Sequence, residues 1–161
     1  MSNSVTVTPA GADQRKLIQN LLQLYIYDFS EFVKVERDRD GLFTYPYLDH
    51  YWREPDRFPF LISVAGEYAG FALVREELDP NTRETAYDMA EFFVMKMFRR
   101  QNTGNQAVQL LLKKLPGNWI VRVLANNQPA YQFWQHALQD FGPHHTLDPA
   151  TSNHKFTFNN N

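Results

Sequence analysis

The chain contains no cysteine among its 161 residues, so it has no disulfide, no thiolate nucleophile and no cysteine-ligated metal. Long apolar runs are also missing, and a run such as residues 60–65 is far too short to span a bilayer. The N-terminal sequence, residues 1–4, lacks the basic start and apolar stretch of a signal peptide. A formal net charge of −2 gives no general attraction to nucleic acid. These absences predict a cytoplasmic protein with neither a membrane nor a nucleic acid as partner.

The length is close to the commonest domain size, and it allows a core to form without covalent staples. No internal repeat and no linker interrupts the chain, which predicts a single domain over residues 1–161. Aromatic residues make up 15% of the sequence and gather in the first half.

Hydrophobic periodicity predicts the order of elements. Alternation favours a strand over residues 4–8, and steps of three and four favour a helix that starts after Asp13 and carries apolar residues as far as Phe32. Residues 36–57 are irregular, with a single helical turn near 47–52. A hairpin at 60–75 turns at Gly66-Glu67, and a further strand covers 86–95. The remaining elements are a helix at 103–115, a strand at 119–124, a helix at 130–141, which Gly142-Pro143 ends, and two short strands near 146–147 and 154–158.

This order places antiparallel hairpins before a strand–helix–strand crossover, which predicts an α/β domain with a mixed sheet. Within it, residues 91–104 are the most informative stretch: an apolar strand, a basic and amide-rich turn, and then a helix. Unpaired N–H groups at a helix start attract an anion, and Arg99 and Arg100 add forked donors suited to phosphate. Gly104 lets the backbone approach a ligand closely. The segment therefore predicts a phosphate-binding turn.

The same stretch resembles the acetyl-CoA signature of the GNAT superfamily, Gln/Arg-x-x-Gly-x-Gly/Ala. Arg99 matches its leading basic position and Gly104 its final small residue, whereas Asn102 replaces the middle glycine. Asparagine tolerates a left-handed backbone well, so the loop shape can survive this replacement.

A second match lies downstream, where residues 127–134 resemble the family's Asn-x-x-Ala-x-x-Phe-Tyr pattern. Asn127, Ala130 and Phe133 fit this pattern. Trp134 stands where the family has a tyrosine that often serves as general acid, and an indole N–H does not titrate. Tyr131, one helical turn earlier, is the residue that can supply a hydroxyl nearby.

The resemblance implies a GNAT-like mixed, mostly antiparallel sheet flanked by helices, with its fourth and fifth strands splayed around acetyl-CoA. It implies an enzyme, a transferase that moves the acetyl group to an amine. A strand N–H near Val94 would stabilise the oxyanion of the reaction. The cofactor-binding residues that it implies are Phe93, Val94, Arg99, Arg100, Gln101, Asn102, Thr103, Gly104, Asn127 and Trp134.

The amine must lose a proton, so a nearby carboxylate or a water chain is expected as the base. Glu91 and Asp88 are the carboxylate candidates, and Tyr131 completes the candidate catalytic residues. In a regular strand Glu91 and Asp88 point to opposite faces. The choice between Glu91, Asp88 and water stays open at this point.

The acceptor is also open. Acidic and aromatic residues between Asp28 and Trp52 suit a cationic amine, or they simply seal the core. The leading interpretation is a small-molecule amine, such as a polyamine, an amino acid or a drug-like amine. The alternatives are a protein N-acetyltransferase and a non-catalytic acyl-CoA-binding module for regulation or interaction; a homodimer is compatible with each. The five histidines show no metal-ligand spacing, so no metal is expected.

Overall fold

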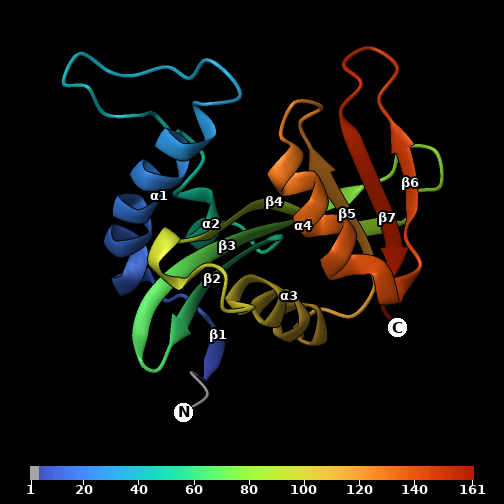
Figure 1. Cartoon of the computed structure of the whole chain (residues 1–161), viewed down its shortest axis with the longest axis horizontal. Coiled ribbons are helices and arrows are strands. Elements are labelled where there is room, and N and C mark those ends of the chain that lie inside the picture. The colour runs from blue at the N-terminus through green and yellow to red at the C-terminus, as the bar shows by residue number, and fades with distance from the viewer. Residues whose placement is uncertain (1–3) are drawn as a thin grey trace.

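The computed structural model describes residues 4–161. Its main elements follow one another in the order strand, helix, short helix, three strands, helix, strand, helix and two strands (Figure 1). Their bounds are β1 (Val5–Pro9), α1 (Arg15–Phe29), α2 (His50–Arg53), β2 (Arg57–Val64), β3 (Glu67–Leu78), β4 (Thr85–Val94), α3 (Thr103–Lys114), β5 (Asn118–Val123), α4 (Gln128–Leu138), β6 (His144–Leu147) and β7 (His154–Asn159). Short 3₁₀ turns occupy Ala12–Gln14, Lys96–Phe98 and Gln139–Phe141.

The strands form one seven-stranded sheet in the order β1-β2-β3-β4-β5-β7-β6. Every neighbouring pair is antiparallel except β4 and β5, which are parallel and are joined through α3. The predicted mixed, mostly antiparallel α/β fold is therefore confirmed. Among the described residues no helix combines the length and the apolar character that a membrane span requires.

Local sequence explains the elements around the later site. Ala65 and Gly66 both have positive φ, 51° and 83°, which is the geometry of a tight hairpin turn between β2 and β3. At the start of α4, the side chain of Asn127 accepts a hydrogen bond from the Ala130 N–H, and a proline lies in the first turn. The predicted helices and strands from residue 57 onward thus agree with the structure to within a few residues.

The first helix differs from its prediction at both ends. Asp13 does not cap it, because residues 12–14 form a 3₁₀ turn in which the Gln14 side chain accepts from the Gly11 N–H. At the other end α1 stops at Phe29, so Phe32 lies beyond it. The Ser30 hydroxyl donates to the Tyr27 carbonyl, and such local side-chain bonds compete with continued helix.

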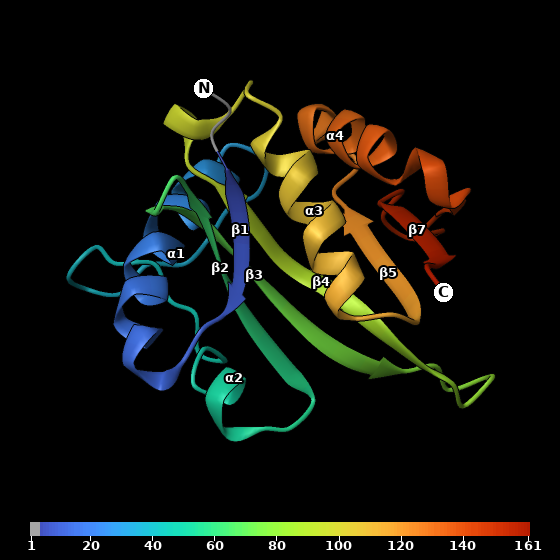
Figure 2. The same ribbon diagram turned by 90° about the horizontal axis from the view of Figure 1, so that it is seen from below.

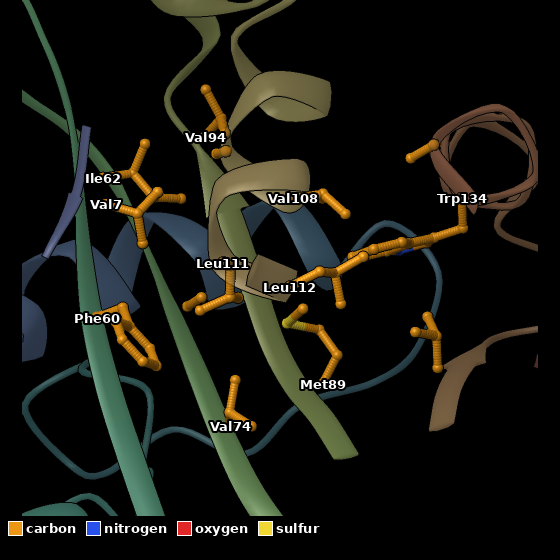
Figure 3. Packing of buried hydrophobic residues seen from close by; sticks show 14 of the residues in the cluster. Val7, Phe60, Ile62, Val74, Met89, Val94, Val108, Leu111, Leu112 and Trp134 are labelled. Carbon is orange, nitrogen blue, oxygen red and sulfur yellow. The ribbon is translucent and has the colours of Figure 1, made fainter. Parts of the chain in front are cut away.

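Two hydrophobic clusters hold the two faces of the sheet. One lies beneath α3 and α4 and includes Val108, Leu111 and Trp134; the other lies beneath α1 and α2 and includes Ile18 and Tyr51. Figure 2 shows α1 and α2 on one side of the sheet and α3 and α4 on the other side. In Figure 3 Trp134 points from α4 toward Leu112 and Met89, so α4 is fastened to both α3 and β4. This packing fixes the helices whose first turns border the site.

The parallel pair β4–β5 comes apart soon after it begins. Its ladder consists of Tyr87 with Trp119 and Asp88 with Ile120, although β4 continues to Val94 and β5 to Val123. Beyond this ladder the edge of β4 that faces β5 has no strand partner among the described residues. The expected splay of the fourth and fifth strands is confirmed, and it leaves backbone polar groups of β4 available to a ligand.

Candidate functional site

A cavity of about 560 Å³ opens where β4 and β5 separate, between the start of α3, the start of α4 and the last turn of α1. Of the residues expected to bind the cofactor, Gln101 alone is not part of its lining. Those that line it are Phe93, Val94, Arg99, Arg100, Asn102, Thr103, Gly104, Asn127 and Trp134. Residues that are 41 positions apart in the sequence, from Phe93 to Trp134, therefore surround one space.

The turn before α3 has the backbone shape that an anion site requires. Arg100 and Asn102 both have φ of 62°, and Asn102, with ψ of 14°, is left-handed as the sequence suggested. Within residues 4–161 no side chain caps α3, and its first intrahelical bond runs from the Gln106 N–H to the Asn102 carbonyl. The N–H groups of residues 103–105 precede that bond, and these residues line the cavity. The helix start can therefore bind a phosphate group.

The cations beside this turn are paired with a carboxylate from α1. Arg99 Nη2 lies 2.8 Å from Asp28 Oδ2, and Lys96 Nζ lies 3.5 Å from Asp28 Oδ1. Arg99 Nε also donates to the Val94 carbonyl at 2.7 Å, at the end of β4. All four residues line the cavity. Asp28 thus balances the positive charge of the turn in the structure.

A second cavity, of about 930 Å³, is lined by residues of α1, by the segment 35–46 and by the β6–β7 hairpin, among others. Figure 1 shows that hairpin and α1 on opposite sides of the splayed strands. Both cavities share a set of lining residues from α1, β4 and α4, so the two spaces meet at the splay. The shared residues are Tyr25, Phe29, Phe92, Asn127, Ala130 and Trp134.

Glu91 lines the second cavity and is the carboxylate best placed for chemistry. Burial raises its pKa from 4.5 to about 7, and the nearby charge of Asp88 adds to the rise. Hydrogen bonding from Tyr25 and Tyr45 and the charge of Arg75 work in the opposite direction. A carboxylate with a pKa near 7 exchanges a proton readily at neutral pH, which suits a general base.

Asp88, the other predicted candidate, lines neither cavity. It is buried, at 4% exposed, and its carboxylate pairs with Arg75 at 2.8 Å and with Arg122 at 3.3 Å. These partners hold the charge in a structural network between three strands.

The expectation that Glu91 and Asp88 point to opposite faces is wrong. The register of β3 and β4 shifts between Leu73 and Val74, so that Leu73 faces Glu91 and Arg75 faces Asp88. Leu73 and Arg75 are two positions apart on β3 and share a face, and directly opposed residues share a face as well. The bulge adds one residue to β4 and so brings both carboxylates to the side of α1.

Tyr131 is not a lining residue of either cavity. Its ring stacks on His154 at 4.2 Å between centroids and on Phe156 at 5.9 Å, against the β6–β7 hairpin. Trp134, by contrast, is 7% exposed and borders both spaces, with its ring edge-to-face against Phe92. Among the described residues no group of three metal-ligating side chains occurs.

Sequence reasoning passed over one residue of the site. Tyr25 occupies a position on the apolar stripe of α1, yet it lines both cavities and hydrogen bonds toward Glu91. Burial and the Glu91 charge raise its pKa well above 10, so it keeps its proton. Asp28 was placed in the acceptor region and instead lines the first cavity, while Tyr45 does line the second. A hydroxyl within an otherwise apolar helical stripe is the one signal that could have indicated Tyr25.

Comparison with known proteins agrees with this geometry. The family model described as "Acetyltransferase (GNAT) family" matches residues 18–138. The chain belongs to the GNAT acetyltransferase family. No curated protein sequence gives a significant match.

Solved structures share the fold of this GNAT protein at low sequence identity. An acetyltransferase from Thermus thermophilus has a TM-score of 0.70 at 15% identity, with 98% of this chain and 97% of that chain covered. Arabidopsis thaliana NAA60, solved in complex with acetyl-CoA, has a TM-score of 0.62 at 11% identity, with 96% and 97% covered. An aminoglycoside acetyltransferase from an uncultured soil metagenomic sample, solved with sisomicin, has a TM-score of 0.61 at 12% identity, with 83% and 86% covered.

Proposed function

We propose that this GNAT protein transfers the acetyl group of acetyl-CoA to the amine of a small molecule, with Glu91 as the general base. The observation that carries the proposal is the meeting of two cavities at the β4–β5 splay, one with a phosphate-binding turn and the other with a carboxylate of raised pKa. Two substrates can thus approach from opposite sides of the sheet and react between the strands. The reaction forms an amide C–N bond, breaks the thioester C–S bond and moves one proton from nitrogen to sulfur.

The first cavity fits acetyl-CoA by the chemistry of its donors. The N–H groups of residues 103–105 and the guanidinium of Arg99 suit the pyrophosphate, and the unpaired edge of β4 near Phe93 and Val94 suits an amide-containing arm. When bound, acetyl-CoA supplies the activated acyl group. Asn127 and Trp134 close the cavity on the side of α4.

Glu91 would accept the proton that the amine loses. The amine must be neutral to attack, and a base with a pKa near the working pH is the most effective one. Tyr25 holds its proton and directs it toward Glu91, so it fixes the orientation of the carboxylate without competing as a base. Asp88 acts on Glu91 through its charge alone, since Arg75 and Arg122 occupy its oxygens.

A strong general acid is not required. The leaving group is a thiolate, and an ordinary thiol has a pKa of about 8.5, so it departs without full protonation. Trp134 cannot supply a proton, and Tyr131 lies on the β6–β7 side of α4, outside both cavities. Tyr131 therefore has no catalytic role in the proposed reaction.

An acetyl-CoA turnover assay across a panel of amines and peptides tests the function directly. Because the protein has no cysteine, a thiol reagent reports the released CoA alone, with no background from the enzyme. We expect thiol release that depends on a small amine and that falls at neutral pH in Glu91→Gln. Binding of acetyl-CoA without turnover of any amine or peptide would instead support the non-catalytic binding module, and turnover of peptides alone would support a protein acetyltransferase.

A further inference from the structure

The second cavity is lined by charged residues of both signs. Glu91 faces it from β4, whereas Arg122 on β5 and Lys155 on β7 face it from the other side of the splay. Arg122 and Lys155 are directly opposed in the β5–β7 ladder, so they share one face of the sheet. Arg122 reaches Asp88, which lies on the same face as Glu91, so this is the face of Glu91 as well.

Most of the charges that line this cavity already have partners. Arg122 is held by both carboxylate oxygens of Glu77, at 3.0 and 3.1 Å, as well as by Asp88. Asp148 accepts hydrogen bonds from the backbone N–H groups of residues 150 and 151, which lower its pKa. Glu36 lies on the exposed segment after α1. The His154 ring is hydrogen-bonded to His145, with Nδ1 of His154 2.9 Å from Nε2 of His145, and burial lowers the pKa of His154.

Lys155 is the exception on the cationic side. Within residues 4–161 its ammonium forms no ion pair within 4.0 Å. Its charge does reach the β3–β4 turn, since it makes a small contribution to the lowered pKa of Asp79, after backbone hydrogen bonds from Asn81 and Thr82. Lys155 itself is partly buried and lines the cavity, so a ligand there meets a cation that no carboxylate neutralises at close range.

The spacing suits one small molecule. Glu91 and Lys155 lie on strands separated by β5, so their backbones are roughly 10 Å apart or somewhat more at the splay, given about 4.8 Å between neighbouring strands. Both residues line the second cavity, so the space between them belongs to that cavity. A molecule with an amine at one end and an anionic group near it can contact both.

From this charge separation we infer that the acceptor is a small amine that also carries a carboxylate, with Lys155 as the residue that binds the carboxylate. The inference rests on the proposed acetyl transfer, and it names the class of acceptor for the same site. Lys155 orients the acceptor so that its amine faces Glu91 and the shared wall of the two cavities. An amine without the anionic group loses this orientation.

Matched acceptor pairs test this assignment, for example phenylalanine against phenethylamine, which differ in the carboxylate alone. We expect wild-type kcat/KM to be about 5- to 10-fold higher for the amino acid, the size of one partly exposed ion pair. In Lys155→Met, which keeps most of the apolar stem, kcat/KM for the amino acid should fall to that for phenethylamine, so that the preference vanishes. Lys114→Met, at the exposed end of α3, is the matched control and should retain the preference. Melting temperatures of both variants verify that they fold.

The outcomes separate this inference from the proposed function. Equal kcat/KM for the two members of each pair in the wild type, or a preference that survives Lys155→Met, overturns the inference and leaves acetyl transfer intact. A peptide with an acidic residue beside its N-terminus forms a third arm, and acceptance of the peptide alone overturns the small-molecule assignment. If no acceptor is turned over, binding of N-acetylphenylalanine and N-acetylphenethylamine in the presence of CoA decides. If the wild type binds N-acetylphenylalanine more tightly than N-acetylphenethylamine and Lys155→Met does not, the carboxylate subsite is supported. Equal binding of the two molecules by the wild type overturns it.

Discussion

Gly104 at the start of α3 lies directly against the ring of Phe133 on α4. A Cβ atom at position 104 would come within 2.9 Å of Phe133 Cε2 and 3.2 Å of Cζ. The glycine therefore sets how closely the two helices approach beside the first cavity, and Phe133 in turn stacks on Phe92 and contacts Trp134.

The contact predicts a specific cost for Gly104→Ala. The ring of Phe133 must move by a few tenths of an ångström and disturb Phe92 and Trp134, so we expect a loss of about 1–2 kcal/mol in the free energy of unfolding. Acetyl-CoA affinity should also fall, because all four residues line the first cavity. Urea unfolding and calorimetric titration measure the two effects. Gly104→Ala with Phe133→Leu should recover part of the affinity, and an unchanged affinity in Gly104→Ala alone would contradict the assignment of this contact to the site.

Neutralising Asp28 should strengthen acetyl-CoA binding. Its carboxylate pairs with Arg99 and Lys96, and it would repel the phosphates of the ligand from the same turn. Because these groups are partly exposed, we expect Asp28→Asn to lower Kd by about 2- to 5-fold at low salt, with a smaller effect at 0.5 M salt. Titration calorimetry at two salt concentrations measures the change. Glu67→Gln, on the exposed β2–β3 hairpin, alters net charge equally and should leave Kd unaltered; weaker binding in Asp28→Asn would show that Asp28 supports the turn rather than opposing the ligand.

The left-handed backbone at Asn102 gives a paired test of the phosphate-binding turn. Asn102→Gly should keep or improve acetyl-CoA affinity, since glycine adopts positive φ without strain. Asn102→Val should weaken it by about 10-fold, because a β-branched residue resists φ of 62° at a cost of about 1–2 kcal/mol. Equal dissociation constants for the two variants would rule out a role for this turn in binding.

The raised pKa of Glu91 predicts the pH dependence of turnover. The carboxylate accepts a proton only when ionised, so kcat/KM should rise with pH through an apparent pKa of about 7 and then level off. Glu91→Gln should lose this limb and about 10²-fold or more in kcat/KM above pH 8, with acetyl-CoA affinity nearly unchanged. If kcat/KM of Glu91→Gln still rose with pH through about 7 in the same pH series, the titrating group would be another residue.

Glu91 also links stability to pH. Its folded pKa of about 7 lies above the ordinary value of 4.5, so the folded state binds more protons between these pH values. The wild type should therefore lose stability relative to Glu91→Gln, on the order of 2 kcal/mol, as the pH rises from 4.5 to 7. Urea unfolding of both proteins at pH 5 and pH 8 provides the measurement, and a constant difference between them would mean that burial does not penalise the Glu91 charge.

Removing the Tyr25 hydroxyl should shift the pH profile of kcat/KM to higher pH. Hydrogen bonding from Tyr25 lowers the pKa of Glu91, so in Tyr25→Phe the limb should shift to higher pH. Turnover at pH 7 then falls while turnover at pH 9 stays near the wild-type value. A loss of the same size at both pH values would indicate a role in shape alone, and Tyr27→Phe, exposed on α1, serves as the control.

Features that depend on residues close together in the sequence could be predicted from it. The hairpin at Gly66, the apolar stripes of α3 and α4 and the basic turn at Arg99 each depend on local spacing, and the structure places them where expected. The bulge in β4 could not be predicted, because counting alternate positions assumes a regular strand. The common face of Asp88 and Glu91 was missed for that reason.

Contacts between residues far apart in the sequence could not be predicted either. Asp28 and Arg99 are 71 positions apart, and nothing in either local pattern indicates that α1 brings its last turn to the start of α3. Tyr25 fits the helical stripe of α1 as well as any core residue does, and its hydroxyl acquires meaning only beside Glu91. Polar groups within apolar stripes are therefore the positions at which sequence analysis alone gives the least information about this site.

Because the ladder between β4 and β5 is short, a ligand bound at the splay can help to hold the two halves of the sheet together. Among the described residues, two residue pairs form the ladder that joins β1–β4 to β5–β7–β6. The core beneath α3 and α4 and the ion pairs of Arg122 with Asp88 and Glu77 add to the contact between the two halves. A molecule that hydrogen bonds along the free edge of β4 while contacting α3 and α4 replaces the missing part of the ladder. Its binding energy then contributes to the cooperativity of folding, so that the two halves of the sheet open less independently when the splay is filled.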